Sequence, residues 1–185
     1  MVFTLGLRHT FPLWQRGLAL VQSRVVQVSL ASVRCRKPLP LCAMNQSSIQ
    51  TEIDSFIPTG DESDDVGRLY DLTDAIESAG ATADLTPNLL AIFERNPDAD
   101  LGSPGPIVHC IESSGMDVFV PHLVASIRAK PTMATLWMAE RCLRSNPSES
   151  LVDVLLSALA TIPANSGASQ QLRDEATSTL SSHGT

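Results

Sequence analysis

The sequence predicts an all-α fold, on three observations. Apolar residues recur at spacings of three and four along most of the chain after residue 60, which places them on one face of a helix. Proline, glycine and short polar clusters divide these stretches into pieces of ordinary helix length. Convincing strand alternation between hairpin turns is lacking, and the best strand candidate, Val118–Val120, lies within a helical period.

Capping signals define the first two helices. Residues 61–78 form the first, because Thr59 and Glu62 have the spacing of a capping box ahead of an apolar stripe. The second begins at Thr86, where a cap residue precedes a proline that suits the first helical position. An Asn-Pro pair at 96–97 ends it.

The remaining helices are expected to begin near residues 104, 117, 132, 148 and 167. Ser103 and Asn146 each precede a proline, and they cap the first and the fourth of these helices. Pro121 is acceptable only if it falls in the first turn of its helix, because an interior proline removes a hydrogen bond. The last helix is the weakest and covers about 168–181.

The spacing of the helices predicts how they assemble. Their starts recur at intervals of roughly 13 to 25 residues, so pairs of helices recur at about 30–45 residues. Two helices alone cannot bury their apolar faces, and consecutive hairpins at this spacing stack into a shared core. We therefore expect residues 61–181 to form a single helical domain of stacked antiparallel helical hairpins. An irregular orthogonal helix bundle is the alternative.

The charge of the chain is divided unevenly. Its net charge is −7, yet residues 1–43 contain six bases and no acid, while all 20 acids follow them. Thirteen of these acids fall within 52–100, against two bases. This excess of negative charge argues against nucleic acid and anionic membranes as partners, and it favours a protein partner with a basic surface.

Residues 1–43 are expected to be a disordered extension rather than part of the fold. Their basic, acid-free composition with interspersed apolar residues is typical of a mitochondrial transit peptide. A mis-assigned start is favoured over a transit peptide, because Met44 opens a polar stretch that resembles an ordinary bacterial N-terminus. Arginines interrupt every apolar run, so neither a secretory signal nor a transmembrane helix is expected. Residues 44–60 are expected to be a polar lead-in.

Residues capable of catalysis are few after residue 44, and none forms a recognised motif. His109 and Cys110 are neighbours on one expected helix, so their side chains point about 100° apart and cannot act as a pair. A zinc site that adds His122 and Cys142 lacks every recognised ligand spacing. Residues 96–102 imitate the start of a calcium loop, but the required glycine and glutamate are missing. We therefore expect no catalytic, cofactor-binding or metal-binding residues, and buried free thiols at both cysteines.

Two sequence blocks resemble a known family. The first runs from Phe93 to Glu112 and contains FERNP and DLGSPGPIVH, and the second runs from Arg128 to Met138 and contains RAKPT. Over about residues 70–145 the chain is similar to HEAT-like immunity proteins of bacterial polymorphic toxin systems. The resemblance implies a HEAT-like stack of hairpins and a cytoplasmic protein that is not an enzyme. It also implies that the protein binds and neutralises a toxin domain.

A non-catalytic, protein-binding immunity protein is therefore the leading expectation. Its expected contact residues are acids of the 52–100 region and polar or amphipathic members of the two blocks: Asp71, Asp74, Asp98, Asp100, His109, Glu112, Lys130 and Trp137. One alternative is a small metal-dependent or hydrolase-like enzyme that uses His109 and His122 with neighbouring acids. Another is a mitochondrial helical-repeat adaptor, which requires a genuine transit peptide in residues 1–43.

Overall fold

The computed structural model describes residues 45–183, which fold into eight α-helices without a strand. The helices are α1 (Gln46–Ser55), α2 (Glu62–Ser78), α3 (Thr82–Arg95), α4 (Pro106–Ser113), α5 (Met116–Ala129), α6 (Met133–Arg144), α7 (Glu149–Leu159) and α8 (Gln170–His183). The all-α fold class that the sequence predicts is therefore confirmed over the described residues. The expected extension, residues 1–43, lies outside them.

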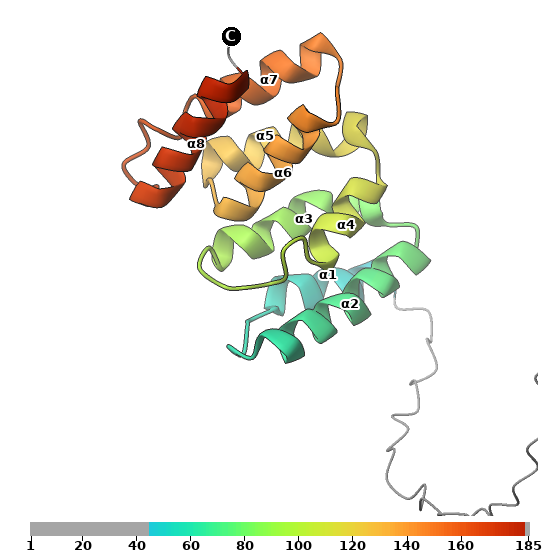
Figure 1. Cartoon of the computed structure of the whole chain (residues 1–185). Helices are drawn as coiled ribbons and strands as arrows, with labels where there is room; N and C mark the ends of the chain where they lie inside the picture. The colour runs from blue at the N-terminus through green and yellow to red at the C-terminus, as the bar shows by residue number, and fades with distance from the viewer. Residues whose placement is uncertain (1–44, 184–185) are drawn as a thin grey trace, which may run out of the picture. The chain divides into compact units, whose positions relative to one another are not determined.

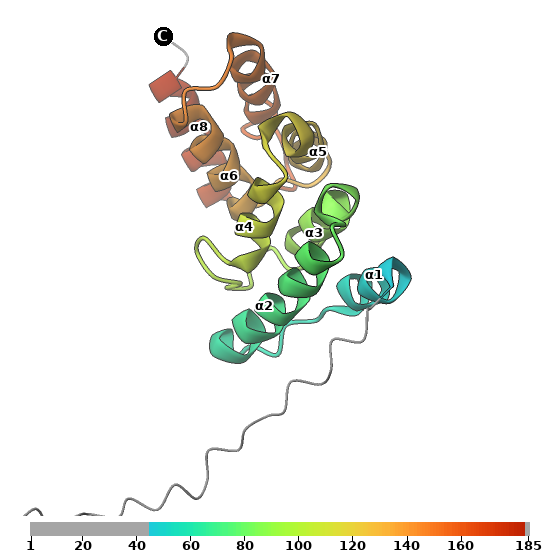
Figure 2. The ribbon, with the colours of Figure 1, turned by 90° about the vertical axis from the view of Figure 1, so that its right-hand side faces the viewer.

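Odd-numbered and even-numbered helices lie in two layers (Figure 1 and Figure 2). In one layer, α1, α3, α5 and α7 pack against one another in succession. In the other, α2 packs on α4 and α6 packs on α8, whereas α4 and α6 lack comparable packing among the described helices. This order of contacts is compatible with the hairpin stacking that the sequence predicts. The separation of α4 from α6 positions the candidate site.

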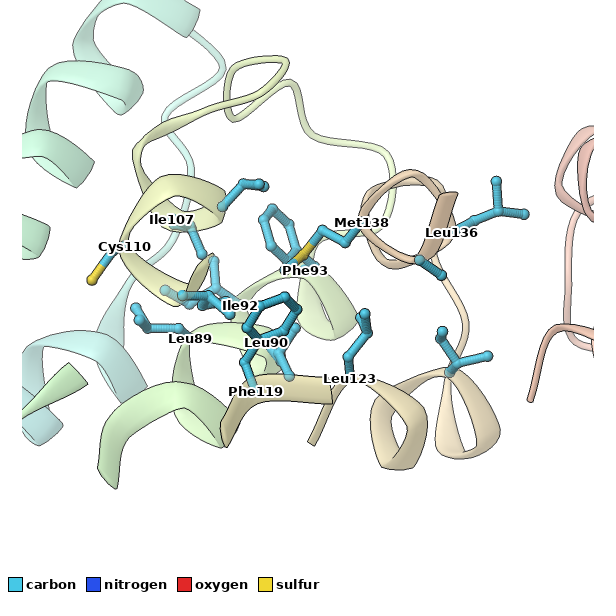
Figure 3. Close-up of a cluster of buried hydrophobic side chains, with 14 of the residues drawn as sticks. Leu89, Leu90, Ile92, Phe93, Ile107, Cys110, Phe119, Leu123, Leu136 and Met138 are labelled. Atoms are coloured by element: carbon cyan, nitrogen blue, oxygen red, sulfur yellow. The ribbon is translucent and has the colours of Figure 1, made fainter. Parts of the chain in front are cut away.

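Helix α3 lies at the centre of the core because it contacts helices of both layers. It packs against α1, α2, α4, α5 and α6. Leu89, Leu90, Ile92 and Phe93 are all buried as a result, and Figure 3 shows them packed with side chains of α4, α5 and α6. A helix that is covered on most sides requires this wide apolar surface.

Helix α1 shows that the expected polar lead-in over 44–60 is wrong. Ile49 and Ile53 are fully buried and Phe56 is 5% exposed, so α1 belongs to the core. These residues have the spacing of a helix face, but three apolar residues in an otherwise polar segment are a weak signal. The guanidinium of Arg95 donates to the backbone carbonyl of Ile53 at 2.7 Å and joins the end of α3 to α1.

Two expected helix starts are displaced because packing overrides local capping signals. Helix α3 begins at Thr82 rather than at residue 86. Burial of Leu85 extends the helix in this direction and leaves Pro87 exposed in its second turn. Helix α4 begins at Pro106 rather than at residue 104, because the preceding residues form a tight loop.

Other local assignments also differ from expectation. Helix α2 is capped by Asp61, not by Thr59. Ser148 is the N-cap residue of helix α7, without a side-chain cap hydrogen bond, and Asn146 lies ahead of it in a left-handed backbone conformation with a φ of 58°. Pro121 lies in the second turn of α5 rather than in the first, and its ring is exposed.

Thr59 instead contributes to a network around the buried carboxylate of Asp65. Asp65 is 2% exposed and accepts hydrogen bonds from the backbone N–H groups of Thr59 (2.9 Å) and Gly60 (3.2 Å). Arg68 pairs with the carboxylate at 3.1 Å and lies over the Phe56 ring, 4.7 Å from its centroid. The Thr59 hydrogen bond is the largest of the effects that lower the pKa of Asp65, against the opposing effect of burial. The network fixes the connection between α1 and α2.

We expect Asp65→Asn to lower the melting temperature at pH 7 by a few degrees, because an amide is a weaker acceptor than a carboxylate. The folded pKa of Asp65 lies below the ordinary value of 3.8, so its carboxylate stabilises the fold above that pH. This stabilisation disappears as the pH falls through the folded pKa. Melting curves at pH 7 and pH 3 should therefore show a smaller acid-induced loss for the variant than for the wild type. Asp71→Asn removes the same charge at an exposed position and is the control. Its acid-induced loss of melting temperature should match that of the wild type. Equal acid-induced losses in all three proteins would contradict the prediction.

Candidate functional site

A cavity of about 550 Å³ lies where α4 and α6 separate. It is bounded by the α3–α4 loop, α4 and α6, and we call it the α4–α6 groove. Its buried apolar lining residues include Phe93, Leu101, Val108 and Met138. Its exposed lining residues include Asp98, Asp100, Trp137 and Arg141. A concavity of this size and composition suits a small ligand or a few side chains of a partner.

Helix α6 supplies one wall because none of the described helices covers one of its faces. Met133, Trp137 and Arg141 occupy successive turns of that face. Leu136 and Leu143 point elsewhere on the helix and are buried. Trp137 remains 43% exposed. The indole therefore offers exposed apolar surface to a partner at the groove.

The α3–α4 loop supplies the opposite wall and is held by close backbone contacts. Asp100 accepts a hydrogen bond from the backbone N–H of Gly102 at 3.1 Å. Gly102 has a φ of 89°, and a Cβ on it would lie 2.8 Å from the Cα of Gly105. Leu101 is 3% exposed and anchors the loop in the core. The loop therefore presents Asp98 and Asp100 at a fixed edge of the groove.

An ion pair between Glu112 of α4 and Arg141 of α6 spans the separation of the two helices. Nε and Nη2 of Arg141 each donate to one carboxylate oxygen of Glu112 at 2.9 Å. The hydrogen bonds and the negative charge of Glu112 raise the pKa of Arg141 above its ordinary value. A second cavity, of about 530 Å³, borders the same ion pair and is lined also by Phe119, Cys142 and Ser145. Arg141 thus borders both cavities, with its charge balanced by Glu112.

The structure brings some of the predicted contact residues together and separates the others. Asp98, Asp100 and Trp137 all line the α4–α6 groove, and Glu112 is connected to it through Arg141. The other four predicted residues are exposed and line neither cavity: Asp71, Asp74, His109 and Lys130. Of the predicted contact residues, the candidate site therefore contains the two acids of the α3–α4 loop and the tryptophan of α6.

The sequence-based prediction missed Met133, Arg141 and Gln171, which also line the groove. The first two are spaced by four residues on either side of Trp137, so the helical period could have identified them. Gln171 comes from α8, and only tertiary packing brings it to this surface.

Several acids within 52–100 have structural roles, and a count of charges does not distinguish them from acids that are available to a partner. Asp61 caps α2 and Asp65 holds the α1–α2 connection. Glu94 accepts a hydrogen bond from the Ser126 hydroxyl and joins α3 to α5. Within the described residues, the exposed acids without a side-chain hydrogen bond or ion pair include Asp71, Asp74, Glu77, Asp84 and Asp98. The surface free to attract a basic partner is therefore narrower than the net charge indicates.

Cys110 and Cys142 are free, buried thiols, as the sequence predicts. Burial is the main effect that raises the pKa of each thiol to about 11. On the order of one such thiol in 10⁴ is ionised at pH 7, and the protonated form is a poor nucleophile. This property disfavours a cysteine-based form of the enzyme alternative. Over residues 45–183, no cluster of three or more His, Cys, Asp or Glu side chains is placed to hold a metal ion.

We expect both thiols to react with a disulfide reagent such as DTNB about 100-fold more slowly in the native protein than in denaturant at pH 7, because the pKa is raised from 9.0 to about 11. The test uses a Cys35→Ser, Cys42→Ser variant, in which only Cys110 and Cys142 are counted. Each thiol ionises at a lower pH in the unfolded chain than in the folded protein. The protonated thiols therefore stabilise the folded state below pH 9, and this contribution is lost as the pH rises to about 11. Rapid labelling of the native variant at pH 7 would contradict this account.

None of the helices in the described part of the chain combines the length and the apolarity needed to cross a membrane. No protein-family model, curated protein or solved structure matches the chain.

Proposed function

We propose that the chain is a non-catalytic protein-binding module, built as a HEAT-like stack of hairpins, that binds a partner at the α4–α6 groove. In its most specific form it is a cytoplasmic bacterial immunity protein that neutralises a toxin domain with a basic surface. The observation that carries the proposal is the half-exposed indole of Trp137 in a groove edged by the carboxylates of Asp98 and Asp100.

The groove has the properties of an interface anchor site. Energetically dominant contacts between proteins are enriched in tryptophan and arginine, and they lie in pockets that lose their water on binding. Trp137 is 43% exposed beside the buried side chains of Phe93 and Met138, so a partner can cover it without a rearrangement of the core. Its burial would add apolar contact area to an interface whose rim is polar.

The charge around the groove favours a basic partner. Asp98 and Asp100 lie on its loop wall, and further exposed acids lie on α2, among them Asp71 and Asp74. Carboxylates arranged in this way accelerate association with a positively charged surface and disfavour an acidic one. The association rate should accordingly fall as the ionic strength rises.

The two sequence blocks that resemble immunity proteins also support the proposal. The first block, Phe93 to Glu112, contributes the end of α3, the acidic loop and α4 to the groove, and the second, Arg128 to Met138, contributes the start of α6. Some residues of each block therefore line the same cavity.

The proposal is tested by affinity capture from cells that naturally express the gene, with the wild type, Trp137→Ala and Val154→Ala as baits. Val154 is also 43% exposed but lies on α7 and does not line the groove, so it is the matched control. We expect a partner that binds the wild type and Val154→Ala equally and binds Trp137→Ala at least about 30-fold more weakly, the effect of losing an anchor of about 2 kcal/mol. A captured partner that binds all three baits with the same affinity would rule out the groove as the binding site.

The immunity form of the proposal requires a further result. Expression of the captured partner alone should arrest bacterial growth, and co-expression of the wild-type chain should restore it. Co-expression of Trp137→Ala should fail to restore growth at an equal protein level. A captured partner that never inhibits growth would leave a binding module but exclude an immunity role.

A further inference from the structure

We propose that the α4–α6 groove recognises an arginine side chain on a segment of the partner, flanked by apolar residues. The inference rests on the proposed function and specifies the chemistry of the partner. The methylene stem of the arginine lies against Trp137 and Met138, and its guanidinium reaches the carboxylates of Asp98 and Asp100. Three observations lead to this occupant.

The first observation is the division of the groove into an apolar floor and an acidic edge. Phe93, Val108 and Met138 are all buried at the floor, while Asp98 and Asp100 are exposed on the loop wall. Arginine has the same division, because its stem is apolar and only its end is charged. A purely apolar side chain would leave the carboxylates unused, and an acidic one would be repelled by them.

The second observation is that the positive charge in the groove is already balanced. Nε and Nη2 of Arg141 both donate to Glu112 at 2.9 Å, so the charge of Arg141 is balanced by Glu112 and not by Asp98 or Asp100. Within the described residues, Asp98 has no hydrogen-bond or ion-pair partner, and Asp100 uses one oxygen for the backbone N–H of Gly102. The groove therefore presents an excess of negative charge to its occupant.

The third observation is the presence of a tryptophan beside these carboxylates. A planar guanidinium stacks on an aromatic face and can pair with a carboxylate at the same time, whereas an ammonium group is a hydrated point charge. The chain itself contains this combination elsewhere, because Arg68 lies over the Phe56 ring at 4.7 Å while it pairs with Asp65 at 3.1 Å. Trp137 with Asp98 offers the same combination to an arginine from outside.

The test uses the full chain with Trp14→Phe, in which Trp137 is the only tryptophan and its fluorescence reports on the groove. The probes are three peptides, Gly-Leu-X-Leu-Gly, in which X is arginine, lysine or citrulline, the neutral analogue that has the shape of arginine. We expect a saturable fluorescence change with the arginine peptide and a dissociation constant at least about tenfold higher for citrulline, with lysine weaker than arginine.

Substitution of the acids checks where the charge is recognised. Asp98→Asn combined with Asp100→Asn should weaken the arginine peptide about tenfold and leave the citrulline peptide unchanged. Asparagine keeps an oxygen that can accept from the Gly102 backbone, so the loop is retained. Asp71→Asn combined with Asp74→Asn removes the same charge from α2 and should leave both peptides unchanged.

Equal affinities for the arginine and citrulline peptides, or no saturable change with any peptide, would overturn the inference. Its failure is distinguishable from failure of the proposed function. A captured partner that depends on Trp137, together with peptides that do not bind, refutes the arginine but not the binding module. Peptides that bind as expected, together with a partner indifferent to Trp137, refute the groove as the partner site.

Discussion

A chain that begins at residue 61 is expected to lose most of the folding stability of a chain that begins at residue 45. Helix α1 buries Ile49, Ile53 and Phe56 almost completely against α2 and α3. Burial of side chains of this size contributes about 1.5–3 kcal/mol each, and a domain of ordinary stability has about 5–15 kcal/mol in total. Loss of α1 also exposes the apolar faces that it covers, so the shorter chain should aggregate or unfold without a cooperative transition.

Urea denaturation of the full chain, of residues 45–185 and of residues 61–185 checks this expectation. A matched pair of substitutions tests the same contact without shortening the chain. Ile53→Ala should cost about 2–5 kcal/mol because it empties a fully buried site. Ile57→Ala, at a side chain that is 73% exposed, should cost less than about 0.5 kcal/mol. Equal midpoints for all three chains would mean that α1 does not stabilise the fold.

Replacement of Gly105 by alanine is the point substitution outside the helices with the largest expected effect. Gly105 has a φ of −85°, which any residue can adopt, so the requirement for glycine arises from space and not from backbone conformation. A Cβ at this position would lie 2.1 Å from the carbonyl oxygen of Leu101. The loop would have to open, which should cost about 2–3 kcal/mol and displace Asp98 and Asp100 from the groove.

Gly67→Ala is the matched control for Gly105→Ala. Gly67 lies within α2, and a Cβ there would meet no atom within 4 Å. Alanine should therefore stabilise the protein by about 0.5–1 kcal/mol through the higher helix propensity. Urea denaturation of the two variants should shift the midpoint in opposite directions. Equal shifts, or a neutral Gly105→Ala, would show that the loop is not closely packed.

The sequence predicts the helices of this fold better than their ends. The existence of a helix in each segment follows from the spacing of its apolar residues, and seven of the eight helices lie in segments that this spacing identifies. The ends depend on tertiary contacts that no local signal contains. Thr86 illustrates this, because the expected cap is a fully buried residue inside α3 whose hydroxyl donates to the carbonyl of Thr82. Helix α1 was missed for the same reason, because only the packing of other helices against it shows that its two isoleucines belong to the core.

The candidate site could be predicted only as separate residues. Asp98 and Asp100 are distinguishable in the sequence as acids of the 52–100 region, and Trp137 as an amphipathic residue of the second block. The groove that unites them depends on the separation of α4 from α6, and helices distant in sequence define that separation. The prediction therefore placed Asp71 and Asp74 in the same surface as Asp98, whereas the structure gives them no part in the cavity.

The interruption of the even-numbered layer has a mechanical consequence. The odd-numbered layer is continuous through the packing of α3 on α5, which is the main contact between helices α1–α4 and α5–α8. A rotation of one half against the other would change the distance between α4 and α6, and it would also disturb the packing of α3 on α6 and of α4 on α5. The Glu112–Arg141 ion pair limits this rotation across the opening. The groove is lined by residues of both halves, so an occupant would contact both at once and would restrain their relative movement.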